Sequence, residues 1–215
     1  MTTGFSIILD HYNQKKYLVN GLQKLNNLYN NWKNKSPKKV VTEEQLHRAL
    51  VKGSHQRRLA NIAIDEAIAK LKLYNDLSDI RNAQFKSFDE LHKHVSNQIL
   101  SIKGISHLTV YDTAIRIGEL LNPKLRPTDY VYVARGTLTG AKKLLGKQVV
   151  KNKLVNGIKL PICLFKQYFP NIESIHLEVI LCIYKDYFIK GGVIPNIKNP
   201  QNIDDLYNAK KQNKP

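Results

Sequence analysis

Cysteine is scarce in this sequence. Only Cys163 and Cys182 occur in 215 residues, and neither is part of a closely spaced cysteine pair. Two thiols do not make a disulfide scaffold in a chain of this length, and a zinc site or an iron–sulfur cluster needs more such ligands. Because both cysteines lie in apolar stretches, we expect two buried free thiols in a reducing compartment.

Long hydrophobic runs are also missing. The longest uncharged apolar run, Val179–Tyr184, is far shorter than the roughly 20 residues that span a bilayer. The first residues, Met1–Leu9, have no basic start and too short an apolar stretch for a secretory signal. These absences predict a soluble, cytoplasmic protein without a membrane partner.

Acidic residues are few. The chain has 17 Asp and Glu against 34 Lys and Arg, which gives a formal net charge of +17. An excess of this size attracts polyanions, so nucleic acid is the expected partner and DNA the favoured one. The alternative is an incidental basic surface, because Lys and Asn also accumulate through genomic base composition, as residues 26–35 suggest.

The histidines form no metal-binding pattern. His92 and His94 would point about 200° apart around a helix, so they cannot chelate one ion. No serine sits in a nucleophile elbow, and no segment has the spacing of a P-loop. We therefore expect neither a metal nor another cofactor.

Apolar residues recur at helical spacing through most of the chain. Steps of three and four predict a helix over 10–32, and capping boxes at Thr42 and Ser87 predict two further helix starts. More helices are expected over 59–71, from Phe88 to the turn at Gly104, from that turn to Leu121, and over 137–145, 172–189 and 203–210. Only Tyr130–Val133 has the composition of a strand.

The expected fold class follows from this pattern. We predict an all-α, compact multi-helix globular fold with at most one short strand pair. Residues 1–215 would form a single helical domain, with 1–100 and 101–215 as possible lobes around a central hairpin. The Asn- and Lys-rich tail, 196–215, is expected to be partly flexible.

The central hairpin is the most informative motif. A very short turn in Ile102–Val110 joins two amphipathic helices, and Gly104 can supply the left-handed conformation that such a turn needs. Ser106 can cap the second helix. The first backbone N–H groups of that helix then form an anion site, flanked by Lys103 and His107, that suits a backbone phosphate.

These residues resemble the helix–hairpin–helix motif of DNA-binding proteins. Gly104, Ile105 and Ser106 match its glycine–apolar–glycine core with Ser in place of the second Gly. Thr109 falls where that family often has Thr, and Val110 falls where it usually has a small residue. The competing interpretation is an ordinary helix–turn–helix corner in which Lys103 is only solvated.

The resemblance extends to helix–hairpin–helix DNA glycosylases, which are all-α and flip a damaged base into a pocket. It implies a catalytic carboxylate downstream of the hairpin, for which Asp129 and Asp112 are the candidates. Leu108 occupies the position of the lysine that some of these enzymes use as a nucleophile, so lyase chemistry is not implied. Neither aspartate has the family's usual apolar–Asp–Thr context, because Asp129 is followed by Tyr130 and Asp112 lies inside the second helix.

Two other basic segments are candidate nucleic-acid contacts. Arg135, Lys142 and Lys143 bracket a stretch with glycine and hydroxyl side chains that could hold a phosphate at a helix N-terminus. Arg57 and Arg58 open a helix, where basic charge is unfavourable unless an external anion is present. Solvated surface helices are the alternative interpretation for both segments.

Three functions are therefore open. The first is a basic helical protein that grips nucleic-acid backbone, most simply DNA, through the hairpin and without clear catalytic machinery. The second is a base-excision glycosylase, and whether the protein is an enzyme at all is not decided by the sequence. The third is a helical interaction module whose positive charge is incidental and whose protein partner the sequence does not identify.

Overall fold

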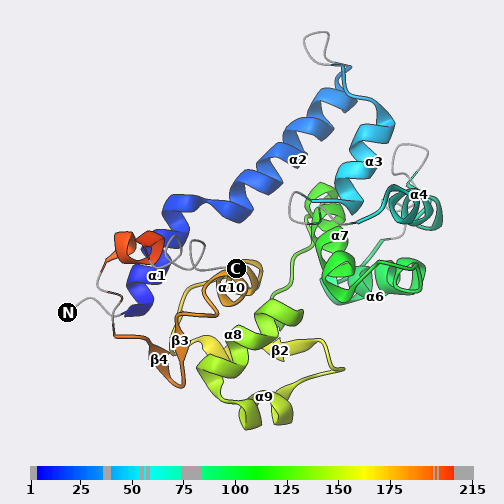
Figure 1. Cartoon of the computed structure of the whole chain (residues 1–215). Helices are drawn as coiled ribbons and strands as arrows, with labels where there is room; N and C mark the ends of the chain where they lie inside the picture. Colours follow the sequence, from blue (N-terminus) through cyan, green and yellow to red (C-terminus); the bar gives the residue numbers. More distant parts are fainter. Residues whose placement is uncertain are drawn as a thin grey trace. The chain divides into compact units, whose positions relative to one another are not determined.

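The computed structural model describes residues 4–35, 40–53, 56, 59–73, 84–195, 197 and 199–205 (Figure 1). The chain divides into two compact units: unit 1 consists of Met1–Leu18 and Thr128–Pro215, and unit 2 consists of Val19–Pro127. Helix α2 (Tyr17–Lys33) carries the chain from the first unit into the second. The division differs from the lobes 1–100 and 101–215, because the N-terminal helix packs into the core of the C-terminal part.

Unit 2 is helical in its described part. It contains α3 (Glu43–Val51), α4 (Asn61–Lys70), α6 (Phe88–Ile99) and α7 (His107–Leu120), besides most of α2. Helix α7 packs against both α3 and α6, and α4 also contacts α3 and α6. The core between these helices is aliphatic and fully or almost fully buried: Leu46, Leu50, Val51, Ala63, Ile64, Ala67, Leu91, Val95, Ile99, Val110, Ala114 and Ile117.

The helix starts in unit 2 follow from their caps. The capping box predicted at Thr42 is confirmed, since the Thr42 side chain accepts from Gln45 N and the Gln45 side chain accepts from Thr42 N, both at 3.2 Å. At Ser87 half of the box forms: the serine accepts from Glu90 N at 3.2 Å. The Glu90 carboxylate instead accepts from Lys86 N at 2.8 Å, one residue before the cap.

Unit 1 combines the two ends of the chain. Helix α1 (Gly4–Lys15) lies with β1 (Tyr130–Tyr132), α8 (Arg135–Leu145), α9 (Lys147–Lys153), β2 (Lys159–Pro161) and the 3-10 turn η1 (Ile162–Phe165). Helix α10 (Ser174–Ile183), β3 (Phe188–Ile189), β4 (Gly192–Val193) and helical residues 200–205 complete it. Its buried core includes Ile7, Ile8, Leu144, Leu160, Phe165, Leu177, Ile180, Leu181 and Tyr184.

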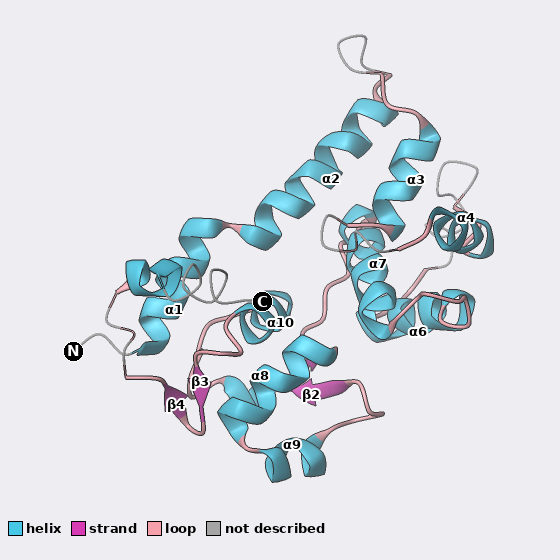
Figure 2. Cartoon of the chain, in the orientation of Figure 1, coloured by secondary structure: helices cyan, strands magenta, loops and turns pink. Residues whose placement is uncertain are grey.

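The mainly helical fold predicted from the sequence is confirmed (Figure 2). The described residues contain two short antiparallel strand pairs. In the first, Val131 of β1 lies opposite Leu160 of β2. In the second, Phe188 lies opposite Val193. At most one pair was expected; the second forms because α10 ends at Ile183, before the predicted 189, and the chain reverses at Gly191 with a φ of 72°.

Two other expectations about helices need correction. The helix predicted over 10–32 is two helices, because Lys16 has a φ of 49°, a left-handed conformation that interrupts α-helical hydrogen bonding. The short helix predicted over 203–210 is helical over 200–205, and its remainder lies outside the described residues, as does most of the tail 196–215. No helix in the described part of the chain is long and apolar enough to cross a bilayer.

Helices α8 and α10 approach each other so closely that glycine is required. A Cβ on Gly140 would lie 2.0 Å from the carbonyl oxygen of Leu181, and a Cβ on Gly136 would lie 2.5 Å from Cys182 Sγ. Between these glycines, the buried Thr137 hydroxyl donates to the Glu178 carboxylate at 2.5 Å. This contact fixes α8 on α10 and leaves the opposite face of α8 exposed.

Candidate nucleic-acid interface

The turn between α6 and α7 has the conformation that its residues predict. Gly104 has a φ of 95°, which L side chains rarely adopt, and the space where its Cβ would lie is open. Ile102 and Ile105 are buried beneath the turn, and Ile105 N donates to Ile102 O at 3.0 Å. The turn is therefore held from below by apolar side chains, while its outer surface consists of Lys103 and Gly104, both exposed.

Helix α7 begins at the exposed end of this turn. The N-cap Ser106 accepts a hydrogen bond from Thr109 N at 3.3 Å, as expected of a cap. The N–H groups of the first turn of a helix lack intrahelical partners, so those of His107 and Leu108 remain available to an external acceptor. Ser106 and His107 are exposed beside them.

Carboxylates are absent from the hairpin over a long stretch. No Asp or Glu occurs between Glu90 and Asp112, whereas Lys93 and Lys103 in the same stretch have exposed side chains. Glu90 lies in the first turn of the 12-residue α6, at the far end from the turn, which is about 15 Å away at 1.5 Å per residue. The residues that form the turn therefore include a lysine and no acidic side chain.

Two of the predicted contact residues have a supporting role instead. Ile105 is only 9% exposed and Thr109 only 5%. The Thr109 hydroxyl lies 3.2 Å from Ser106 Oγ, so it strengthens the cap rather than facing outward. Lys103, Gly104, Ser106 and His107 remain as the outer surface of the hairpin, because a buried side chain cannot reach a phosphate.

Asp112, one candidate catalytic carboxylate, belongs to a polar cluster that supports the end of α3. Its carboxylate accepts from Gln56 Nε2 at 2.9 Å and lies 3.9 Å from Arg116 Nη2. Arg116 donates in turn to the carbonyls of Leu50 and Val51, each at 3.3 Å. These carbonyls lie at the C-terminal end of α3, where helical carbonyls lack intrahelical partners. Asp112 therefore has a structural role: it holds Gln56 and Arg116 at the end of α3.

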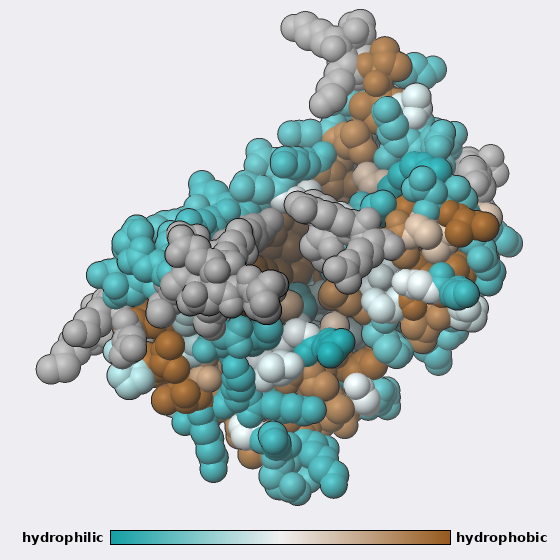
Figure 3. All heavy atoms as spheres, viewed as in Figure 1, coloured by the Kyte–Doolittle hydropathy of each residue, from teal (hydrophilic) through white to brown (hydrophobic). Residues whose placement is uncertain are grey.

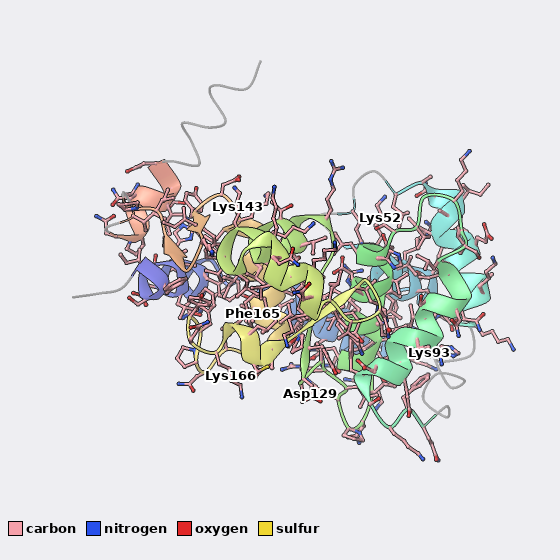
Figure 4. All side chains as sticks on the ribbon, turned by 90° about the horizontal axis from the view of Figure 1, so that it is seen from below. Lys52, Lys93, Asp129, Lys143, Phe165 and Lys166 are labelled. Carbon is pink, nitrogen blue, oxygen red and sulfur yellow. The ribbon has the colours of Figure 1, made fainter. Side chains whose placement is uncertain are left out.

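Asp129, the other candidate, lies in unit 1 at the start of β1, and its side chain is exposed (Figure 4). Its backbone carbonyl accepts from Ile162 N at 2.9 Å, which extends the pairing of β1 with β2. A carboxylate that stabilises a developing cation is normally sheltered from water, and Asp129 has no such shelter within its own unit. The position equivalent to the hairpin lysine of lyases is occupied by the half-buried Leu108.

The segment from Arg135 to Lys143 differs from the predicted phosphate loop. Its glycines and Thr137 lie inside α8 and face α10, as described above, so they do not cradle an anion. Arg135, Lys142 and Lys143 have exposed side chains. Lys143 pairs with Asp186 at 2.9 Å. The other predicted basic pair, Arg57 and Arg58, lies outside the described residues.

Sequence patterns missed the buried hydrogen-bonded clusters. In unit 1 the buried His11 is within 2.6 Å of the Tyr184 hydroxyl and 3.2 Å of the Asp204 carboxylate, which also pairs with Lys15 at 3.0 Å. Tyr184 is fully buried, and this chain of groups ties α1 to the end of α10 and to residues 200–205. The partners are 173 and 193 positions apart, so no local signal could have revealed them.

Unit 2 contains a second unpredicted cluster around Glu119 at the end of α7. This carboxylate is 3% exposed and accepts from Lys124 at 2.5 Å, from Arg126 at 2.9 Å and from Asn26 at 3.1 Å. Burial raises the pKa of Glu119, but these hydrogen bonds outweigh burial and hold the pKa below its usual value. The cluster holds the loop after α7 in place, and it pairs the two basic side chains of that loop, Lys124 and Arg126, with Glu119.

The thiols and histidines offer no metal centre in the described part of the chain, where no group of three His, Cys, Asp or Glu side chains is arranged to hold an ion. Both cysteines are free, but the prediction that they are buried is wrong: Cys163, in the surface turn η1, is exposed and Cys182 is half-buried. Tyr111, Tyr132, Tyr184 and Tyr187 are buried in the core.

The hairpin thus has the left-handed glycine and the serine cap that its residues predict. Both features also occur in helix–turn–helix corners with no ligand, so the resemblance to DNA-binding hairpins depends on the charge and exposure of the turn. No protein-family model, curated protein or solved structure matches this chain.

Proposed function

We propose that this protein binds the phosphate backbone of nucleic acid, with DNA as the favoured form, through the turn between α6 and α7. The observation that carries the proposal is the composition of the turn surface: Lys103, Ser106 and His107 are exposed at the N-terminus of α7, and the sequence has no carboxylate between Glu90 and Asp112. A backbone phosphate supplies the charge and the acceptors that this surface lacks.

The chemistry of the turn favours contact without sequence readout. Its donors are a lysine, the hydroxyl of the N-cap serine and backbone N–H groups, and contacts of this kind position a protein on phosphates without discriminating bases. The turn is short and held from below by Ile102 and Ile105, so it presents these donors in one arrangement. Binding should therefore depend steeply on salt and weakly on sequence.

The test measures fluorescence anisotropy of a labelled DNA duplex over a series of KCl concentrations. We expect Lys103→Glu to weaken binding about tenfold at low salt and to reduce the slope of log K against log salt by about one. The matched control is Lys24→Glu, an exposed lysine on α2 in the same unit, which changes the net charge equally and should alter Kd less than about threefold.

A second substitution tests the backbone of the turn. Gly104→Val places a β-branched residue at a φ of 95° and should weaken binding by distorting the turn. Circular dichroism and thermal melting show whether the helices persist in each variant. Equal effects of Lys103→Glu and Lys24→Glu, or no binding of wild-type protein at about 50 mM salt, would exclude the turn as the contact site.

A further inference from the structure

A second basic surface lies in unit 1. Residues 130–172 contain eight Lys and Arg and no Asp or Glu, although the chain has 17 acidic residues overall. This stretch forms β1, α8, α9, β2 and η1, all within unit 1. One continuous part of unit 1 thus carries eight basic residues and no acidic residue.

The fold turns nearly all of these cations outward. Seven of the eight have exposed side chains: Arg135, Lys142, Lys143, Lys147, Lys151, Lys153 and Lys166. Lys142 and Lys143 close α8, and α9 follows directly after Gly146, whose φ of 90° makes the corner. Lys147 and Lys151 are one turn apart on α9, with their Cβ atoms about 6 Å from each other. In Figure 3 the surface where α9 lies is hydrophilic.

Packing explains this exposure. Gly136, Thr137 and Gly140 hold one side of α8 against α10, and Leu144 and Val150 are fully buried under α8 and α9. At η1, Phe165 is fully buried while its neighbour Lys166 is exposed (Figure 4). Apolar side chains of this segment pack into the core, and its exposed lysines lie on the solvent side.

Few of these basic side chains are paired with groups of the protein itself. Lys143 pairs with Asp186 at 2.9 Å, and the buried Lys159 lies 4.3 Å from the centre of the Tyr130 ring. The other six cations have no ion-pair partner among the residues that the structure describes. In contrast, Lys124 and Arg126 in unit 2 are both paired with Glu119.

We infer that the exposed lysines of α8 and α9, the α8–α9 surface defined by Lys142, Lys147, Lys151 and Lys153, form a second site for nucleic-acid phosphates. Unit 1 thereby binds nucleic acid independently of the hairpin in unit 2. The inference takes its class of ligand from the proposed function, but it rests on different residues and can stand if the hairpin does not bind.

The composition of the surface favours nucleic acid over other polyanions. Val149, 41% exposed, is the one large apolar side chain that α9 leaves outside, which is too little for a helix that inserts into a membrane interface. An interface for an acidic protein would need a central cluster of exposed aromatic or aliphatic anchors. Lysines with exposed Gln148 and Asn152 among them instead match the polar, strongly basic character of phosphate-binding surfaces.

The test replaces four lysines with glutamine: Lys142→Gln, Lys147→Gln, Lys151→Gln and Lys153→Gln. Its control carries Lys24→Gln, Lys33→Gln, Lys35→Gln and Lys86→Gln, four exposed lysines of unit 2, so both variants have a net charge of 17 − 4 = +13. We expect the first variant to bind a labelled duplex roughly 100-fold more weakly at about 100 mM salt and to lower the salt slope by about three. The control should remain within about fivefold of wild type.

The outcomes separate the two sites. Equal effects of the two quadruple variants would overturn the inference, whatever Lys103→Glu does. A full effect of the α8–α9 variant with no effect of Lys103→Glu would support the inference and remove the hairpin proposal. Binding to anionic phosphatidylserine vesicles or to polyglutamate as tight as binding to the duplex, and lost in the same variant, would overturn the choice of nucleic acid.

Discussion

Gly140→Ala is expected to destabilise unit 1 by about 3 kcal/mol. The added methyl group would lie 2.0 Å from the carbonyl oxygen of Leu181 and 2.9 Å from its carbonyl carbon. The obstacle is backbone in the last turn of α10, so no side chain can rotate away and the two helices must separate. Separation would also stretch the 2.5 Å hydrogen bond between Thr137 and Glu178, which are both buried.

Urea unfolding followed by far-UV circular dichroism measures this effect. The control is Thr139→Ala, an exposed position one residue earlier on α8, which should change stability by less than about 1 kcal/mol. Gly136→Ala adds a second comparison, because its Cβ would meet a side-chain atom, Cys182 Sγ, at 2.5 Å. Adding Cys182→Ala should then recover part of the loss. If Gly140→Ala unfolds like Thr139→Ala, the close approach of α8 and α10 is wrong.

Glu119→Gln is expected to cost unit 2 about 2 kcal/mol at pH 7, because Lys124 and Arg126 lose a carboxylate partner and the neutral amide offers one acceptor oxygen in place of two. Both cations are more than a third exposed and can regain water, with side chains 53% and 37% exposed, so the loss stays below that of a fully buried pair. The loop that follows α7 would then be held mainly by the 3.0 Å hydrogen bond from Leu125 N to Gly118 O.

The same residue predicts a pH dependence. The pKa of Glu119 is lower in the folded protein than in the unfolded chain, where a glutamate titrates near about 4.3. Its contribution is therefore complete above that value and is lost as the pH falls through the lower, folded pKa. Stability of wild type and Glu119→Gln, measured from pH 7 to pH 3, should converge towards the acid end. If the difference in unfolding free energy between the two proteins stayed constant over this range, the ionised Glu119 carboxylate would not be the source of the stabilisation.

The roles of Glu119 and of the two α8 glycines could not be predicted from the sequence, for different reasons. Glu119 sits on a helix that the apolar spacing predicts, but its three donors come from α2 and from the loop after α7. Gly136 and Gly140 look like parts of a phosphate loop when only their neighbours are considered. Their use in helix packing is evident only once α10, about 40 residues further along the chain, lies against them.

The candidate site shows the same contrast. The glycine turn and the Ser106 cap could be predicted, because a cap depends on atoms within three residues of each other. The role of Asp112 could not, since its partner Gln56 is 56 positions away. Thr109 and Ile105 were assigned to the contact surface because burial is not a property of a short motif. Their exposure is set by how α6 and α7 pack.

The sequence by itself determined the helical class, the caps at Thr42 and Ser106, the left-handed turn at Gly104 and the excess of positive charge. All of these depend on composition or on interactions between near neighbours. The tertiary structure decided that the N-terminal helix joins the C-terminal half, and which cations are paired, buried or exposed. It also narrowed the candidate contact residues of the hairpin to four, and it placed the lysines of α8 and α9 at the surface. The reason is that packing between distant segments determines which side chains water can reach.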